Sequence, residues 1–371
     1  MDESGAEYLT TDAGRVPAAG LVVPRADGTT AWETYRRQAD RYFRGSVAVM
    51  GAITTIWLAF LATGRDRGLF GSYEVGLEAV GRVAVGFAIV SVLWGWLWYW
   101  IKRLLLWKLA GFSAAELDAV FRSRMTGPFD LPALLRRHSE RRVRIVDMIG
   151  RRGRFLTIAV LGFSYIYTRV AHDPTPEFLF LGLHETLFDA IAYGWLMLAF
   201  YYSDGFLGRV TYGAQTRIMD GTLGRANCLV ITMLWSLFKF IMVPLGYQLA
   251  SLFPPSTYAT VFAFVWVSYV AGDGLSEITG QLFGRQKLRV WGIGEVNRKS
   301  VAGTWACFLG SLAVCLFLVH VNGLGPAWVG LAVVVSVSNT AFELFSPRGT
   351  DDFTMATANA VLCLAFGRLV L

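Results

Sequence analysis

Long apolar runs, separated by polar and arginine-rich segments, dominate the chain. Each run is close to the roughly 20 residues that a helix needs to cross a bilayer. We assign nine of them, at residues 45–63, 83–101, 155–171, 178–202, 227–250, 257–275, 301–321, 325–345 and 354–371. The pattern predicts an all-α, polytopic integral membrane protein with about nine transmembrane helices.

The polar segments predict how these helices are oriented. Four arginines within residues 36–44 lie directly before the first run, residues 102–154 are rich in arginine, and the later loops alternate between basic and nearly uncharged. Lysine and arginine collect on the cytoplasmic side of membrane proteins. We therefore expect a cytoplasmic N-terminus. The arginines of 136–154 fit an orientation signal that contacts anionic lipid, and a phosphate-binding patch is the alternative.

Polarity also divides the chain into three parts. Residues 1–44 are predicted to form a disordered tail followed by an amphipathic interfacial helix from Trp32 to Arg44. Residues 45–204 form an N-terminal transmembrane region that includes the arginine-rich segment 102–154. Residues 205–371 form a second membrane domain, which holds most of the candidate chemistry.

Composition agrees with a membrane protein. Of 371 residues, 54% are hydrophobic and only 16% are charged, whereas a soluble domain has about 25% charged residues. The net charge of +7 comes mainly from arginines that flank apolar runs, so we expect no nucleic-acid partner. The four cysteines lie in or beside apolar runs without CxxC spacing, so no disulfide framework or zinc site is expected.

The most informative segment is GDGLSEITGQLFGRQK, residues 272–287. At 100° per residue, five of its positions fall within roughly 80° of one helical face. They are Asp273, Glu277, Gly280, Gly284 and Lys287. Carboxylates can hold a cation, glycines allow a ligand to approach closely, and lysine can hold anionic oxygens. We expect a site for a metal ion and a nucleotide here, although a glycine stripe for helix packing is an alternative.

Two further groups lie downstream. Arg298, Lys299, Ser300 and Gly303 stand at the start of an apolar run, where free N–H groups can bind phosphate, with Ser300 as the N-cap. Ser336, Asn339, Thr340 and Glu343 share one helical face within about 100°. Asp351 and Asp352 follow that run at the cytoplasmic mouth. Paired carboxylates there suit metal binding or a general base. The chain has no G-x-x-x-x-G-K-[ST] motif, so a P-loop enzyme is excluded.

These residues resemble the polyprenol kinase family, which includes dolichol, phytol and farnesol kinases and the fungal CTP-dependent diacylglycerol kinase, and which is distantly related to CDP-diacylglycerol synthase. The resemblance covers roughly residues 205–371 and rests on GDGLSEITGQLFGRQKL, NRKSVAGT and FELFSPRGTDDFTMAT. The family has Asp-Asn-x-x-x-Pro where this chain has Asp351-Asp352 and no proline. An Arg-Lys-x-x-His motif of the family is replaced by Gly224-Arg225-Ala226-Asn227-Cys228.

The resemblance implies a membrane enzyme that transfers the γ-phosphate of CTP from the cytosol to a lipid alcohol, with Mg²⁺ as cofactor. It implies metal binding by Asp273, Glu277 and Asp351. Catalysis would use Asp273, Asp351, Asp352 and Glu343, with Glu343 lining the acceptor cavity and Asp351 or Asp352 taking the hydroxyl proton. The nucleotide would contact Glu277, Gly280, Gly284, Lys287, Arg298, Lys299, Ser300 and Gly303.

Other functions remain open at this stage. A cytidylyltransferase would release pyrophosphate instead of CDP, and a diacylglycerol kinase would use a different alcohol. A transporter or a non-catalytic lipid-binding protein would place its charges near the middle of the bilayer in paired spans. The sequence leaves open which alcohol is used, whether UTP or ATP replaces CTP, and how many chains assemble.

Overall fold

The structure is a computed structural model that describes residues 8–11, 14–17, 31–63, 77–122, 131–172, 187, 190–292, 295–346 and 350–370. The chain divides into two compact units, each made of separate stretches. The first contains residues 1–51, 88–154 and 192–233, and the second contains 52–87, 155–191 and 234–371.

Helices make up most of the described chain. They are α1 (Ala31–Thr63), α3 (Leu77–Ala110), α4 (Ala114–Phe121), α5 (Leu131–Arg137), α6 (Glu140–His172), α8 (Phe206–Gly213), the 3₁₀ helix η1 (Ile218–Leu223), α9 (Gly224–Leu252), α10 (Pro255–Leu282), α11 (Val301–Val321), α12 (Pro326–Phe345) and α13 (Asp351–Leu369). Two antiparallel strand pairs accompany them, β1 (Tyr8–Thr11) with β2 (Gly14–Pro17) and β3 (Lys287–Gly292) with β4 (Glu295–Ser300).

Five stretches of the described residues are long and apolar enough to cross a membrane: Arg36–Ala59, Gly224–Leu252, Thr257–Leu282, Val301–Val321 and Pro326–Phe345. The helical fold and the multi-pass membrane character predicted from the sequence are therefore confirmed. The nine spans and the cytoplasmic N-terminus stay predictions, and residues 178–186, 188 and 189 of the run 178–202 lie outside the described residues. The proposed interfacial helix is continuous with the first run, because both lie in α1.

In the first unit, a capping box stabilises the N-terminal end of α4. Glu116 accepts hydrogen bonds from the backbone N–H (2.9 Å) and the hydroxyl (2.8 Å) of Ser113, and His138 Nε2 lies 3.0 Å from its other oxygen. The Ser113 backbone bond and the His138 contact lower the pKa of Glu116 to about 2. The carboxylate is thus better stabilised in the folded than in the unfolded chain.

This carboxylate predicts an acid-sensitive contribution to stability. A group whose pKa is depressed on folding stabilises the protein above its unfolded pKa, and the contribution disappears as the pH falls. We expect Glu116→Gln to lower stability by about 1 kcal/mol at pH 7. The difference from wild type should shrink between pH 4.5 and about 2. Thermal unfolding in detergent across that range tests this, and a difference that does not change with pH contradicts it.

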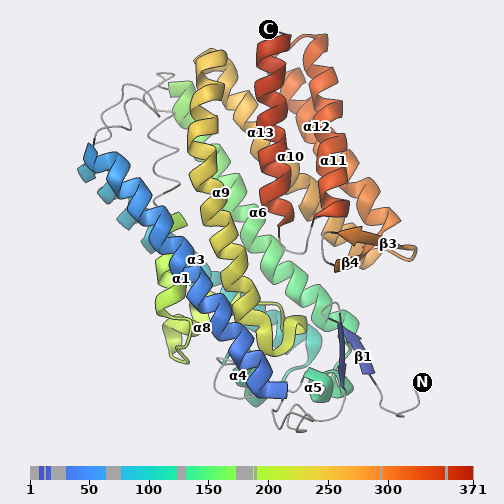
Figure 1. Cartoon of the computed structure of the whole chain (residues 1–371). Helices are drawn as coiled ribbons and strands as arrows, with labels where there is room; N and C mark the ends of the chain where they lie inside the picture. The colour runs from blue at the N-terminus through green and yellow to red at the C-terminus, as the bar shows by residue number, and fades with distance from the viewer. Residues whose placement is uncertain are drawn as a thin grey trace. The chain divides into compact units, whose positions relative to one another are not determined.

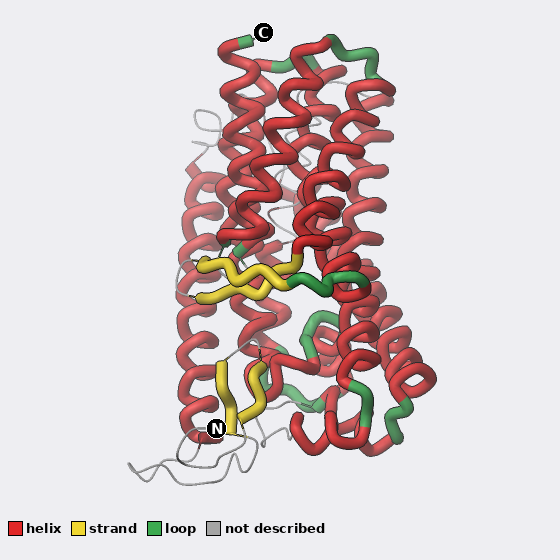
Figure 2. The backbone as a smooth tube through the Cα atoms, turned by 90° about the vertical axis from the view of Figure 1, so that its right-hand side faces the viewer, coloured by secondary structure: helices red, strands yellow, loops and turns green. Residues whose placement is uncertain are grey.

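The second unit is built around four helices, α10 to α13, which contact one another and run side by side (Figure 1). Aromatic and aliphatic side chains from α9 to α13 form its core. The β3–β4 hairpin connects α10 to α11 and lies across one end of these helices (Figure 2). Inside the bundle, Asn339 donates to Ser268 and Ser311 (3.2 Å each) and accepts from Asn359 (2.9 Å). These buried side chains link α10, α11, α12 and α13 in one hydrogen-bonded network, which fixes the positions of the four helices relative to one another.

Glycines allow α10 and α11 to approach closely. A Cβ added at Gly303 would lie 2.9 Å from the Ser276 carbonyl oxygen and 3.4 Å from the Cα atom of Gly280. Ser300 caps α11 by accepting from the backbone N–H of Gly303 at 3.1 Å, as the sequence predicts. The glycine stripe thus packs helices, which is the alternative that the sequence left open.

A methyl group at this contact should be costly. We expect Gly303→Ala to destabilise the protein by about 1–3 kcal/mol, because backbone atoms of α10 must move. Gly330→Ala is the matched control: Gly330 is an exposed glycine of α12 with nothing within 4 Å of an added Cβ, so it should be neutral or stabilising by up to about 1 kcal/mol. Thermal unfolding of both variants in one detergent measures the contrast. Equal effects of the two substitutions would contradict the packing argument.

The predicted helical face is correct only in part. α10 ends at Leu282, where Phe283 forms the C-cap, and Lys287 begins β3. Gly284 and Lys287 therefore do not continue the face that carries Asp273, Glu277 and Gly280. The segment 285–299, read from the sequence as a basic loop, contains the β3–β4 hairpin. Just after the helix ends, Gly284 lies so close to Gly280 and Ser300 that a larger residue would clash with both.

Candidate functional site

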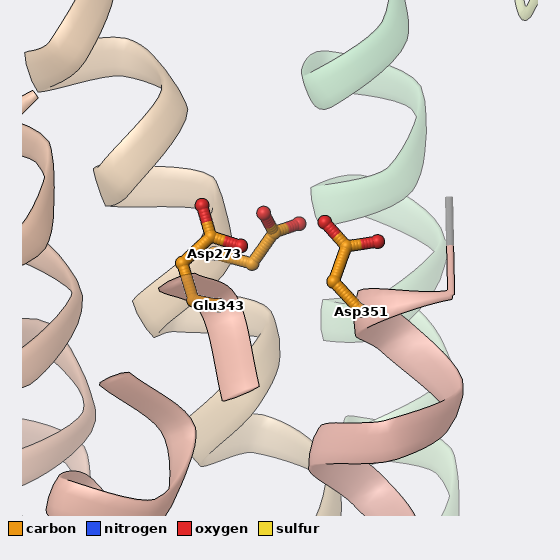
Figure 3. A group of neighbouring side chains, drawn as sticks. All are labelled: Asp273, Glu343 and Asp351. Carbon is orange, nitrogen blue, oxygen red and sulfur yellow. The ribbon is translucent and has the colours of Figure 1, made fainter. Parts of the chain in front are cut away.

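Three carboxylates from three helices converge at one end of the bundle. Asp273 lies in α10, Glu343 in the last turn of α12 and Asp351 at the start of α13. One oxygen of each lies within 4.8 Å of the others, and the side chains point toward one another (Figure 3). Asp273 and Glu343 are buried and Asp351 is half-buried.

Glu343 is held through one of its two oxygens. Lys299 Nζ donates to Glu343 Oε1 at 2.7 Å, and the Ser276 hydroxyl donates to the same oxygen at 3.0 Å. The second oxygen, Oε2, is buried and has no hydrogen-bond partner. A buried carboxylate oxygen left in this state is costly unless something positive occupies the space beside it.

Lys299 stabilises the acidic group. It is the second-last residue of β4, beside the connection to α11, and its side chain is 28% exposed. Burial opposes its charge, but Glu343, Asp351 and Asp273 outweigh burial and raise the pKa of Lys299 above the ordinary lysine value. Lys299 is therefore a permanent cation at this site.

The arrangement suits a divalent cation. Three carboxylates opposite one ammonium leave about two negative charges. Mg²⁺ prefers oxygen ligands and usually binds through one or two carboxylates together with phosphate oxygens. The unpartnered Oε2 of Glu343 supplies one such oxygen. The donor set fits Mg²⁺ and lacks the nitrogen and sulfur ligands typical of zinc.

The other predicted site residues lie around this group. Glu277 is one helical turn beyond Asp273, half-buried, and accepts from Gln281 Nε2 at 3.3 Å, outside the carboxylate cluster. Asp352 neighbours Asp351, and its backbone N–H donates to Asp351 Oδ1 at 3.3 Å. Lys287 is exposed at the start of β3. The side chain of Arg298 lies outside the described residues, while Ser300 caps α11.

Sequence reasoning missed two roles. Ser276 belongs to the GDGLSEITG segment, but its bond to Glu343 links α10 to α12, which no local pattern reveals. Lys299 was predicted to hold phosphate, whereas its described partner is Glu343. The available signal was spacing: Ser276 follows Asp273 by three residues, so both share one side of a helix.

No family profile and no solved structure match the chain. The chain is 32% identical over 107 residues to a protein named phytol kinase from Synechocystis sp.. The match covers 28% of this chain and 44% of that protein, so the chain spans less than half the length of this relative. The similarity to phytol kinase confirms the resemblance to the polyprenol kinase family that the residues 272–303 indicate.

Proposed function

We propose that this protein is a CTP-dependent kinase whose substrate is a membrane lipid alcohol of the isoprenoid type. One observation carries the proposal: three carboxylates and a lysine meet at the end of an apolar helical bundle. Such a site places a charged, metal-binding centre beside the lipid phase. The similarity to phytol kinase supports the choice of a lipid alcohol as acceptor.

Asp273, Glu343 and Asp351 would hold the metal ion. Bound there, Mg²⁺ would supply positive charge that offsets the negative charge developing during phosphoryl transfer. Exposed Lys287, together with Arg298, would contact the phosphate oxygens. Lys299 and Ser276 would keep Glu343 oriented through Oε1, which leaves Oε2 for the cation.

The reaction itself needs positioning and one proton acceptor. The lipid hydroxyl oxygen attacks the γ-phosphorus in line, while the bond from that phosphorus to the β–γ bridging oxygen breaks and CDP leaves. The hydroxyl proton passes to Asp351 or Asp352, which sit together at the start of α13. The apolar chain of the alcohol would lie against exposed apolar side chains of the bundle, such as Phe342 and Phe345.

A transfer assay tests this function. Purified protein with Mg²⁺ and CTP labelled at the γ-phosphate is offered phytol, farnesol, a long polyprenol and diacylglycerol in turn, with UTP and ATP as competing donors. We expect label in an isoprenoid product together with released CDP. Label in diacylglycerol alone would change the acceptor class.

Two other outcomes reject the kinase. Pyrophosphate released only when a lipid phosphate is supplied identifies a cytidylyltransferase. No turnover in either assay, with a protein that still unfolds cooperatively, favours a transporter or a non-catalytic lipid-binding protein.

A further inference from the structure

The first compact unit holds a group of three cationic side chains, of which Lys102 and Arg225 are buried and Arg122 is exposed. A small cavity of about 10 Å³ is lined by Lys102, Arg122, Thr216, Arg225 and apolar neighbours from α4 and α8. Among the side chains that line it, three are cationic and none is a carboxylate. Arg122 is exposed and Lys102 is paired with Asp147 at 2.6 Å, so Arg225 is the buried cation of this lining whose charge needs a partner.

Arg225 carries most of the argument. Its side chain is 2% exposed. One nitrogen, Nη1, donates to the carbonyl oxygens of Tyr201 (3.0 Å) and Ser203 (2.9 Å), beyond the C-terminal end of the helical stretch Ala190–Ala199. The guanidinium also lies over the Tyr212 ring, 4.9 Å from its centroid. These contacts satisfy one side of the group and leave the other side for a different partner.

The other nitrogen has no such partner. Arg225 Nη2 is buried without a hydrogen bond, and so is the hydroxyl of Thr216 in the same cavity lining. Lys102 is already bound to Asp147 at 2.6 Å and to the Thr216 carbonyl oxygen at 2.8 Å, so it does not compensate Arg225. A buried charge without an ion pair is expensive. Arg225 is also the second residue of the 29-residue helix α9, whose N-terminus favours an anion.

We propose that this cavity binds one small inorganic anion of the size of chloride. The volume admits about one water-sized particle, which excludes a phosphate ester or a nucleotide. A single water could accept from Arg225 Nη2 but would bring no negative charge to it. The anion would accept from Arg225 Nη2 and from the Thr216 hydroxyl, and it would lock α9 to the segment 200–203.

Halide dependence of stability tests the site. Thermal unfolding is measured in detergent at constant ionic strength while chloride is replaced by gluconate, which is too large for the cavity. We expect the wild-type Tm to be about 2–4 °C higher in chloride. Arg225→Gln and Thr216→Val should lose this response. Arg209→Gln is the matched control, because Arg209 lies on α8, donates to the Asp204 carbonyl oxygen and does not line the cavity.

A direct observation completes the test. Crystals grown in bromide should show an anomalous peak in contact with Arg225 Nη2, and this peak should be absent in Thr216→Val or Arg225→Gln crystals. The Thr216→Val variant keeps the arginine, so the test survives if Arg225→Gln does not fold. A cavity that holds only a water, or a halide response that is equal in wild type and Thr216→Val, overturns the proposal. Neither result depends on whether the protein is a kinase.

Discussion

Replacing Asp273 by asparagine is expected to reduce phosphoryl transfer by about 10²–10³-fold, as loss of a main electrostatic contributor at a transition state does. The substitution keeps the size of the side chain and removes one negative charge from three carboxylates whose oxygens lie within 4.8 Å of one another. Repulsion within the group falls, so the Tm should stay unchanged or rise. Initial rates over a Mg²⁺ series, with the Tm of each preparation, measure both effects.

Glu277→Gln is the matched control for this variant. Glu277 lies one turn along the same helix but outside the cluster, with Gln281 as its partner. We expect a loss of no more than about 10-fold. A protein in which Glu277→Gln is as inactive as Asp273→Asn would place the cation on the exposed side of α10. Full activity of Asp273→Asn would reject the cluster as the metal site.

Replacing Lys299 by methionine is expected to cost about 2–4 kcal/mol of stability. The ammonium lies 2.7 Å from a Glu343 side chain that is only 5% exposed. Removing one partner of a buried pair leaves an uncompensated charge, which costs more than the pair itself contributes. Activity should fall as well, because Glu343 Oε1 keeps only the Ser276 hydroxyl as a donor. Thermal unfolding and the Mg²⁺ concentration for half-maximal activity report the two effects separately.

A second substitution separates charge from packing. In Lys299→Met combined with Glu343→Leu both charges are absent, so most of the stability should return while activity stays lost. Lys287→Met is the surface control: Lys287 is exposed, and the change should alter stability by less than about 0.5 kcal/mol. Additive losses in the double variant would show that Lys299 and Glu343 do not interact.

The sequence predicts those features of this site that depend only on residues close together in the chain. Hydropathy identifies the helices because a bilayer requires long apolar runs, and residue type identifies Ser300 as a helix cap. The 3.6-residue period places Asn339 and Glu343 on one buried face, which the structure confirms. Each of these inferences needs only neighbours in the chain.

Contacts between distant segments are harder to predict. Whether Glu277 or Glu343 joins Asp273 depends on how α10 and α12 pack, and helical spacing favoured Glu277. Just after α10 ends at Leu282, Gly284 lies close to Ser300, the N-cap of α11, and this contact also joins distant parts of the sequence. The sequence around Lys299 is typical of a phosphate ligand, and the 2.7 Å contact with Glu343 is visible only in the structure. Tertiary packing therefore decides which members of a polar motif meet.

The burial of every cysteine has a practical consequence for mapping the protein in its membrane. Cys228, Cys307, Cys315 and Cys363 are all at most 7% exposed, and buried thiols react slowly. A single cysteine introduced at an exposed site can therefore be labelled in the otherwise native chain. Ser251→Cys and Arg285→Cys flank the two ends of α10. A reagent that does not cross membranes should reach only one of them in sealed vesicles, which reports directly which end of α10 faces the cytosol.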